Sequence, residues 1–325
     1  MKKYLSVFVV LLLSGCIGTK NTADLYTTRE ETALGTFISI TIEKTPQFTQ
    51  TQDSAFSKID RFEEQFSVYI SDSEISRLNK NKEIKASEDL LSVFKKSIHI
   101  SRITGGAFDI TTLPLTKLYR EAEKSDTPPP EEKIKEVLKD IGYEKIRITE
   151  NIIKIPSKME VDVGGIAKGY VVDRVAEYLQ REGVRNGLVN AGGDMYCFGK
   201  NSAGTKWRVA INNPFRKGEI LQTLYVSGYG IATSGNYERY LSIQGKKFGH
   251  IINPFTGKTL QDIPASVTVI APDTTTADGL ATAFFVLGIE KSLTLADELQ
   301  DIAVFIVDAD GKIYKNQRLS QFLIP

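Results

Sequence analysis

The sequence predicts an α+β fold in a single domain. Segments with the period-two pattern of strands alternate along the chain with segments in which large apolar residues recur at helical spacing. No internal repeat or low-complexity tract interrupts this alternation. A hydrophobic fraction of 41% over 325 residues is enough for a globular core.

The first residues have the layout of an export signal. Two lysines precede an apolar run from Leu5 to Leu13, which is too short to span a bilayer as a stable helix. The segment LSGC that follows resembles the bacterial lipoprotein cleavage box, which implies removal of residues 1–15 and a lipid on Cys16. The alternative is an ordinary cleaved signal with an incidental cysteine. We therefore expect an exported protein, anchored by lipid to a bacterial membrane, whose domain faces the periplasm or the cell exterior.

Residues 16–28 are then the lipidated cysteine and a flexible tether, and residues 29–325 form the folded domain. The β-branched stretch 31–43 predicts the first strand. Residues 52–66 carry phenylalanines and an isoleucine at helical spacing and predict an amphipathic helix. A second helix is expected over residues 88–104, ended by two glycines.

A proline run at residues 128–130, followed by two glutamates, predicts a loop leading into a helix that continues to about Ile141. Strands are expected near residues 145–149 and 152–155, and a third approaches Asp162.

The most informative segment is MEVDVGGIAKGYVVDRVAEYL, residues 159–179, whose pattern is strand, glycine turn and amphipathic helix. Backbone N–H groups at the start of a helix favour a phosphate, and Lys168 could add a positive charge. The glycine spacing matches neither a Walker loop nor the dinucleotide fingerprint. Without a ligand, the same segment would be a tight strand-to-helix connection.

Three further segments each allow a structural and a functional interpretation. Asn190–Asp194 alone favours a hairpin turn, and residues 232–240 could bind phosphate but favour a turn. His250, in HIINPFTG, could transfer a proton or contact phosphate, or could be structural. The other histidine, His99, is expected to be structural or exposed and to have no part in the chemistry.

Asp278 and Thr282 are four residues apart in a predicted helix that opens at Thr276 or Ala277, so their oxygens would lie on one face. Mg²⁺ prefers oxygen ligands and is commonly held by one or two carboxylates together with substrate phosphates. The alternative is an acidic helix start with an unrelated threonine one turn later.

Charge and cysteine content exclude two classes of protein. The 41 basic and 40 acidic residues leave a net charge of +1, and no basic run is present, so nucleic-acid binding is not expected. Besides Cys16 the chain has only Cys197, so the mature protein should have no internal disulfide.

In this order, the segments resemble the ApbE family of FAD:protein FMN transferases over nearly the whole chain after Cys16. The matching segments are ALGTF (33–37), FSVY (66–69), SEISRLN (73–79), GGAFDITTLPL (105–115), VDVGGIAKGYVVD (161–173), NAGGD (190–194), TSGNYER (233–239), HIINPFTG (250–257) and ADGLATA (277–283).

The resemblance implies two intertwined subdomains with a flavin-nucleotide cleft between them and a metal that bridges the pyrophosphate of FAD. It places the metal on Asp278, Thr282 and the backbone carbonyl of Gly165. The positions that fall on flavin-nucleotide contacts are Leu34, Tyr69, Ala107, Phe108, Asp109, Asp162, Lys168 and His250. Leu34 stands where a methionine is usual, and Asn253 replaces the usual aspartate, which leaves open how His250 is oriented.

The implied activity is Mg²⁺-dependent transfer of FMN from FAD to a threonine of an acceptor protein, with release of AMP and with His250 as candidate base. The acceptor would be a subunit of a membrane redox complex. Two alternatives remain: an FAD pyrophosphatase that uses water as acceptor, and a non-catalytic FAD-binding lipoprotein. A transporter's substrate-binding lipoprotein would leave the Asp278 and Thr282 pair unexplained.

Overall fold

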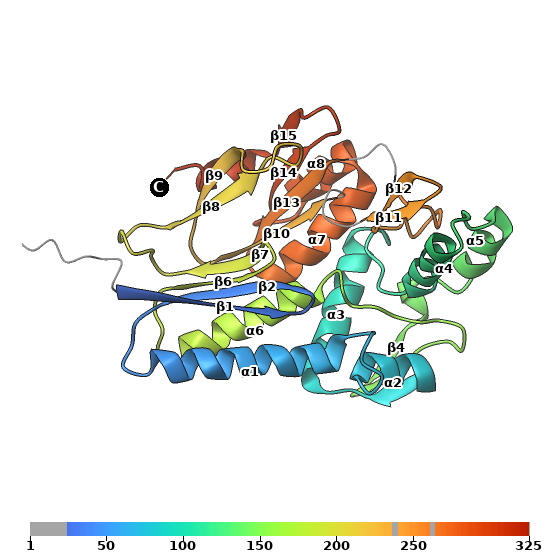
Figure 1. Ribbon diagram of the computed structural model, residues 1–325, viewed down its shortest axis with the longest axis horizontal. Coiled ribbons are helices and arrows are strands. Elements are labelled where there is room, and N and C mark those ends of the chain that lie inside the picture. Colours follow the sequence, from blue (N-terminus) through green and yellow to red (C-terminus); the bar gives the residue numbers. More distant parts are fainter. Residues whose placement is uncertain (1–24, 236–239, 261–263, 325) are drawn as a thin grey trace, which may run out of the picture.

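An antiparallel sheet of eight strands runs through the computed structural model, which describes residues 25–235, 240–260 and 264–324 (Figure 1). The strand order is β1-β2-β6-β7-β10-β13-β14-β15. Their bounds are β1 Tyr26–Ala33, β2 Thr36–Glu43, β6 Gly187–Ala191, β7 Asp194–Phe198, β10 Tyr229–Gly235, β13 Ser266–Ala271, β14 Ala303–Val307 and β15 Ile313–Lys315. Hairpins such as β1–β2 and β6–β7 alternate in this sheet with pairs from distant parts of the sequence, such as β2–β6 and β10–β13. The antiparallel sheet and its helices confirm the predicted α+β class.

Both faces of the central strands are buried. In β14, Val304 and Ile306 point into the main core, whereas Ala303, Phe305 and Val307 point into a second core on the other face. Helices cover the first face; they are α1 Phe48–Phe66, α3 Glu88–Ile103, α6 Ala167–Arg181, α7 Thr274–Leu287 and α8 Ile289–Glu298 (Figure 1). The second face is covered by β8 Trp207–Asn212, β9 Ile220–Val226 and the 3₁₀ helix η3 Gln317–Phe322.

Smaller elements extend the fold beyond the sheet. They are α2 Glu74–Asn81, β3 Glu83–Lys85, α4 Leu113–Lys124, α5 Glu131–Leu138, η2 Tyr143–Lys145, β4 Arg147–Thr149, β5 Ile152–Lys154, β11 Tyr240–Ile243 and β12 Lys246–Gly249. Helices α4 and α5 share a third core with the β11–β12 hairpin, through residues such as Leu115, Ile134 and Ile243. Among the described residues, no helix is long and apolar enough to cross a membrane.

The structure corrects the expectation of one strand over residues 31–43. The chain instead reverses at Leu34 and Gly35, with φ angles of 54° and 68°, and forms the β1–β2 hairpin. Positive φ at both turn residues suits the twist of paired strands, but Leu at such a position gives no sequence signal. Strand β1 begins at Tyr26 and thus includes residues assigned to the tether.

Two other expectations differ from the structure. No strand approaches Asp162: Val161 exchanges hydrogen bonds with the side chain of Asn79 instead of with a neighbouring strand. Helix α7 begins at Thr274, earlier than predicted, because Asp273 caps it. The helices expected over residues 52–66, 88–104 and 131–141 are present as α1, α3 and α5.

Candidate functional site

Three segments meet where α6 begins. The ammonium group of Lys168, in the first turn of α6, forms an ion pair with Asp194 at the start of β7 and lies 3.6 Å from Oδ1 of Asp278 on α7. The other carboxylate oxygen of Asp194 accepts a hydrogen bond from the backbone N–H of Thr233, at 3.3 Å. Burial raises the pKa of Asp194, and the charge of Lys168 opposes that rise.

Asp278 is fixed by the backbone of α6. Its Oδ2 accepts a hydrogen bond from the N–H of Gly169 at 3.0 Å, and the residue is 4% exposed. The close approach requires glycine, since a Cβ built at Gly169 would lie 2.4 Å from the carbonyl oxygen of Thr274. Gly169 therefore lets α6 and α7 touch at the point where Asp278 faces the glycine turn.

Thr282 lies one turn after Asp278 and faces Gly165. A Cβ built at Gly165 would lie 3.6 Å from the hydroxyl oxygen of Thr282 and 3.2 Å from the ring of Phe108. The Thr282 hydroxyl is also 3.4 Å from that of Ser234, at the end of β10. The structure thus brings Gly165 close to Asp278 and Thr282, although both lie 113 or more residues after Gly165 in the sequence.

The grouping offers only oxygen donors to a metal: a carboxylate, a hydroxyl and a backbone carbonyl. Within the described part of the chain, no three or more His, Cys, Asp or Glu side chains form a metal-binding cluster. Zinc sites in proteins usually include histidine or cysteine ligands, whereas Mg²⁺ prefers oxygen ligands such as these.

Two predicted flavin-contact carboxylates shape the backbone around the site. Asp109 accepts hydrogen bonds from Thr111 N–H at 2.8 Å and from Tyr143 N–H at 2.9 Å, and Asp162 accepts one from Gly164 N–H at 2.8 Å. Burial raises the pKa of both carboxyl groups against these hydrogen bonds.

Tyr69 is 72% exposed, and its hydroxyl accepts a hydrogen bond from Arg120, whose guanidinium lies 5.2 Å from the ring centre. Both residues line a cavity of about 380 Å³ together with Val68, Ser76, Asn79, Lys80, Leu113, Lys117 and Glu160. Asn79 lines this cavity and exchanges hydrogen bonds with the backbone of Val161, so the cavity adjoins the segment that leads into the glycine turn.

Leu34 lies in the turn of the β1–β2 hairpin, where its N–H donates to Glu63 of α1 at 3.1 Å. The hairpin also contacts the β6–β7 turn, because Gly192 N–H donates to the carbonyl of Phe37 at 2.9 Å. Ala107 and Phe108 are buried.

His250 is exposed and follows β12. Its loop reaches the segment with predicted flavin contacts at Ala107, Phe108 and Asp109, since a Cβ built at Gly106 would lie 3.5 Å from the ring of Phe255. Asn253 turns this loop: its side-chain oxygen accepts hydrogen bonds from the N–H groups of Phe255 and Thr256, at 2.9 and 3.2 Å. An amide oxygen can do this as well as a carboxylate, so the exchange for the usual aspartate preserves the turn.

Comparison with known proteins identifies the family. The sequence matches the ApbE family over residues 34–306. The chain belongs to the ApbE family.

Relatives in this family span almost the full chain. An FAD:protein FMN transferase of Vibrio cholerae is 34% identical, covering 97% of this chain and 96% of the relative, and one of Haemophilus influenzae is 33% identical, covering 91% and 92%. Solved ApbE structures superpose closely. The flavin transferase from Vibrio cholerae has a TM-score of 0.81 at 30% identity, covering 92% of this chain and 99% of that one. The ApbE protein from Thermotoga maritima has a TM-score of 0.83 at 28% identity, covering 92% and 100%.

Two residues that the structure places around the candidate site were not predicted from sequence. Asp194 was assigned to a hairpin turn, although it also forms an ion pair with Lys168. Asp173, on α6, accepts hydrogen bonds from the first turn of α7. The signal for Asp194 was present in the NAGGD segment. Asp173 ends the VDVGGIAKGYVVD segment, but it was not singled out because an acidic residue within an amphipathic helix is expected on its solvent face.

Proposed function

We propose that this chain transfers FMN from FAD to a threonine hydroxyl of an acceptor protein, in a reaction that needs Mg²⁺ and releases AMP. The observation that carries the proposal is the meeting of the glycine turn with Asp278 and Thr282 in a chain of the ApbE family. The threonine oxygen forms a bond to the FMN-side phosphorus. The bond from that phosphorus to the bridging oxygen breaks, AMP leaves with that oxygen, and the hydroxyl proton passes to a base.

The residues present fit a magnesium ion. Asp278, Thr282 and the carbonyl of Gly165 would hold it, because the missing side chain at Gly165 leaves space between Thr282 and Phe108. When bound, Mg²⁺ would neutralise charge on the pyrophosphate and so ease attack by an oxygen nucleophile. Lys168 and the N–H groups of the glycine turn would add positive potential at the same place.

FAD would contact Leu34, Tyr69, Ala107, Phe108, Asp109, Asp162 and Lys168. Asp109 and Asp162 would act partly through the backbone that their carboxylates hold in place. The exposed ring of Tyr69 offers a flat apolar surface next to a guanidinium, which suits a planar ligand with anionic groups. His250 would accept the hydroxyl proton or contact a phosphate.

The proposal includes the location of the enzyme. The signal at residues 1–15, the lipid on Cys16 and residues 17–24 of the tether lie outside the described residues and rest on the sequence pattern. A lipid anchor would hold the domain beside a membrane, and the acceptor would be a subunit of a membrane redox complex exposed on the same side.

The decisive experiment mixes the domain, started after Gly18, with FAD, Mg²⁺ and a threonine-bearing acceptor subunit. We expect the mass of the acceptor to rise by one FMN, with AMP formed in equal amount. An acceptor with valine in place of that threonine is the matched control and should stay unmodified. AMP with free FMN would instead indicate a pyrophosphatase, and tight FAD binding with neither product would indicate a carrier.

A further inference from the structure

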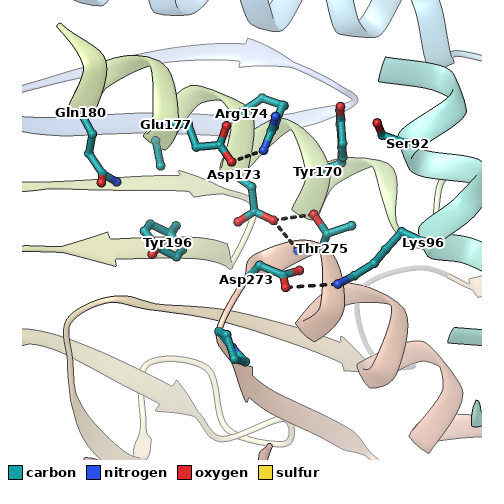
Figure 2. Close-up of a pocket in the computed structure, with 12 residues that line it drawn as sticks. Ser92, Lys96, Tyr170, Asp173, Arg174, Glu177, Gln180, Tyr196, Asp273 and Thr275 are labelled. Carbon is teal, nitrogen blue, oxygen red and sulfur yellow. Dashed lines mark hydrogen bonds and ion pairs between the residues drawn. The ribbon is translucent and has the colours of Figure 1, made fainter. Parts of the chain in front are cut away.

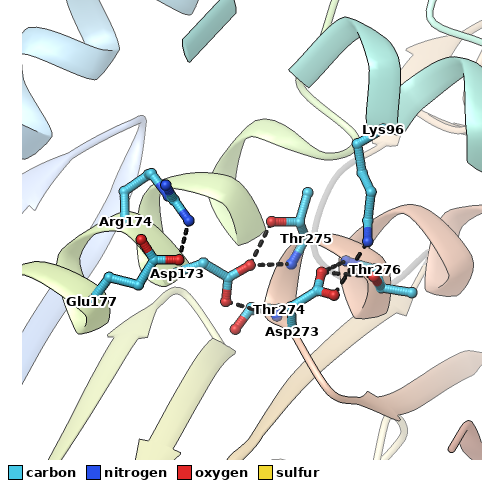
Figure 3. Close-up of polar contacts among 8 residues, drawn as sticks. All are labelled: Lys96, Asp173, Arg174, Glu177, Asp273, Thr274, Thr275 and Thr276. Carbon is cyan, nitrogen blue, oxygen red and sulfur yellow. Dashed lines mark hydrogen bonds and ion pairs between the residues drawn. The ribbon is translucent and has the colours of Figure 1, made fainter. Parts of the chain in front are cut away.

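Two carboxylates hold the first turn of α7, the helix that carries Asp278 and Thr282 (Figure 3). Asp173, from α6, accepts hydrogen bonds from Thr274 N–H and Thr275 N–H, both at 2.8 Å, and from the Thr275 hydroxyl. Asp273 accepts from Thr276 N–H at 2.6 Å through its side chain and from Ala277 N–H at 3.2 Å through its carbonyl. The N–H groups of Thr274, Thr275 and Thr276, which have no partner within the helix, are therefore satisfied by the two carboxylates, and Ala277 N–H makes the first bond of the helix itself.

Asp173 differs from Asp273 because it belongs to another helix. It lies one turn after Gly169 on α6, so both residues are on the same face of that helix. Gly169 N–H binds Asp278, and Asp173 binds Thr274 and Thr275. Helix α6 therefore contacts α7 at two points along the α6 axis. Together these contacts fix the rotation of α7 about its own axis and its position along that axis.

On one side of the start of α7, a cavity takes the place of apolar packing. A cavity of about 440 Å³ opens there, lined by residues of α3, α6, β7 and the start of α7 (Figure 2). Tyr170, Tyr196 and Lys96 line it, and Lys96 forms a 3.2 Å ion pair with Asp273 across its edge. On this side, the helix start is therefore held by hydrogen bonds and ion pairs.

The chemistry of Asp173 suits this role at neutral pH. The residue is 8% exposed, and burial raises its pKa to about 6 although the hydrogen bonds from α7 favour the ionised form. Above that pH the carboxylate is ionised, and an ionised carboxylate can accept all three hydrogen bonds at once.

We propose that Asp173 is a positioning residue that sets the geometry of the metal-binding face of α7. The inference rests on the proposed function in so far as Asp278, Thr282 and Gly165 hold a metal. Gly165 precedes α6 whereas the two side chains belong to α7, so the relative position of the helices sets the spacing of the donors. Mg²⁺ demands near-ideal octahedral geometry and is sensitive to such a displacement.

The test is Asp173→Asn, which conserves volume but directs an amide toward N–H donors. Mn²⁺ binding to the purified domain is followed by the EPR signal of the free ion. We expect the dissociation constant for Mn²⁺ to rise by about 10- to 100-fold, as is usual when a residue that orients metal ligands is lost. The Mg²⁺ concentration for half-maximal AMP release should rise in parallel.

Glu177→Gln is the matched control, since Glu177 lies on the same helix, lines the same cavity and pairs with Arg174. Mn²⁺ binding by this variant should equal that of the unchanged domain.

Two further variants should show intermediate Mn²⁺ affinities. Thr275→Val removes one of the three hydrogen bonds and should weaken Mn²⁺ binding less than Asp173→Asn. Asp173→Glu restores a carboxylate and should recover part of the affinity that asparagine loses. A lowered melting temperature of Asp173→Asn with unchanged Mn²⁺ binding would reduce Asp173 to a stabilising residue and overturn the proposal. If Asp173→Asn fails to fold, unchanged Mn²⁺ binding by Thr275→Val overturns it equally.

The unchanged domain separates this inference from the proposed function. If it binds Mn²⁺ but forms no FMN adduct, the proposed transferase activity is wrong. The order of Mn²⁺ affinities among the variants then still decides the role of Asp173. If it forms the adduct and Asp173→Asn binds Mn²⁺ equally well, the inference about Asp173 fails alone.

Discussion

His250 has an exposed imidazole in a loop that packs against the segment of Phe108 and Asp109. If it takes the proton of the acceptor threonine, His250→Gln should lower the turnover number by about 10²- to 10⁴-fold, the usual contribution of a general base. The KM for FAD should change little. Both values come from AMP release with a fixed acceptor concentration.

The other histidine of the chain supplies the control for that prediction. His99→Gln, on α3, should leave turnover unchanged because no part of the proposed reaction uses this side chain. Near-normal turnover of His250→Gln would remove the proposed role of His250 in proton transfer.

Individual site residues could be predicted where their type matched a chemical need, and not where their role depended on the fold. Asp278 and Thr282 were candidates because their spacing places them on one helical face, and the resemblance to the ApbE family implied their role as metal ligands. Asp194 and Asp173 were not, since their partners Lys168 and Thr274 come from other segments of the chain. Sequence spacing carries no information about such contacts.

At the scale of elements, the contact between α6 and α7 depends on Gly169. Gly169→Ala would push a methyl group against the backbone of Thr274, which cannot move as a side chain can. We expect a loss of about 1–3 kcal/mol in the free energy of unfolding, typical of overpacking, measured by denaturant titration. Mn²⁺ binding should weaken as well, because Asp278 is displaced with α7.

Gly279→Ala is the control for that prediction, as it adds the same group to α7 at a contact with α3. Its methyl group would meet the end of the Ile100 side chain, which is flexible, and alanine favours a helix over glycine. Its stability should therefore change much less. Equal losses in both variants would contradict the view that backbone contact at Gly169 is the special feature.

Most helices could be predicted from their apolar spacing, and the β1–β2 hairpin could not. Residues 31–43 form one continuous run of strand-forming residues, and the reversal occurs at a leucine and a glycine without the Asn or Asp that usually precedes glycine in such turns. The register of these strands follows from pairing with β6, far away in the sequence.

At the scale of the whole molecule, the α+β class was predictable from alternating patterns, whereas the strand order was not. The sheet places β2 beside β6 and β10 beside β13, so helices and strands from both halves of the sequence enclose the site. Local pattern gives the elements, but the pairing of distant strands is decided by burial on both faces of the sheet.

Because the site joins segments from Phe108 to Thr282, bound ligands should stabilise the molecule as one unit. A ligand that binds only the folded chain adds about 2.7 kcal/mol to the free energy of unfolding at 100 times its dissociation constant. FAD with Mg²⁺ should therefore raise the melting temperature more than FAD alone, in a single transition.

In Asp278→Ala the added effect of Mg²⁺ should vanish together with Mg²⁺-dependent AMP release, while the shift caused by FAD alone should remain. Comparing shifts within each variant corrects for the carboxylate's own contribution, through Gly169 N–H, to the stability of the unliganded chain. A full Mg²⁺ increment in Asp278→Ala would mean that the ion binds elsewhere in the molecule.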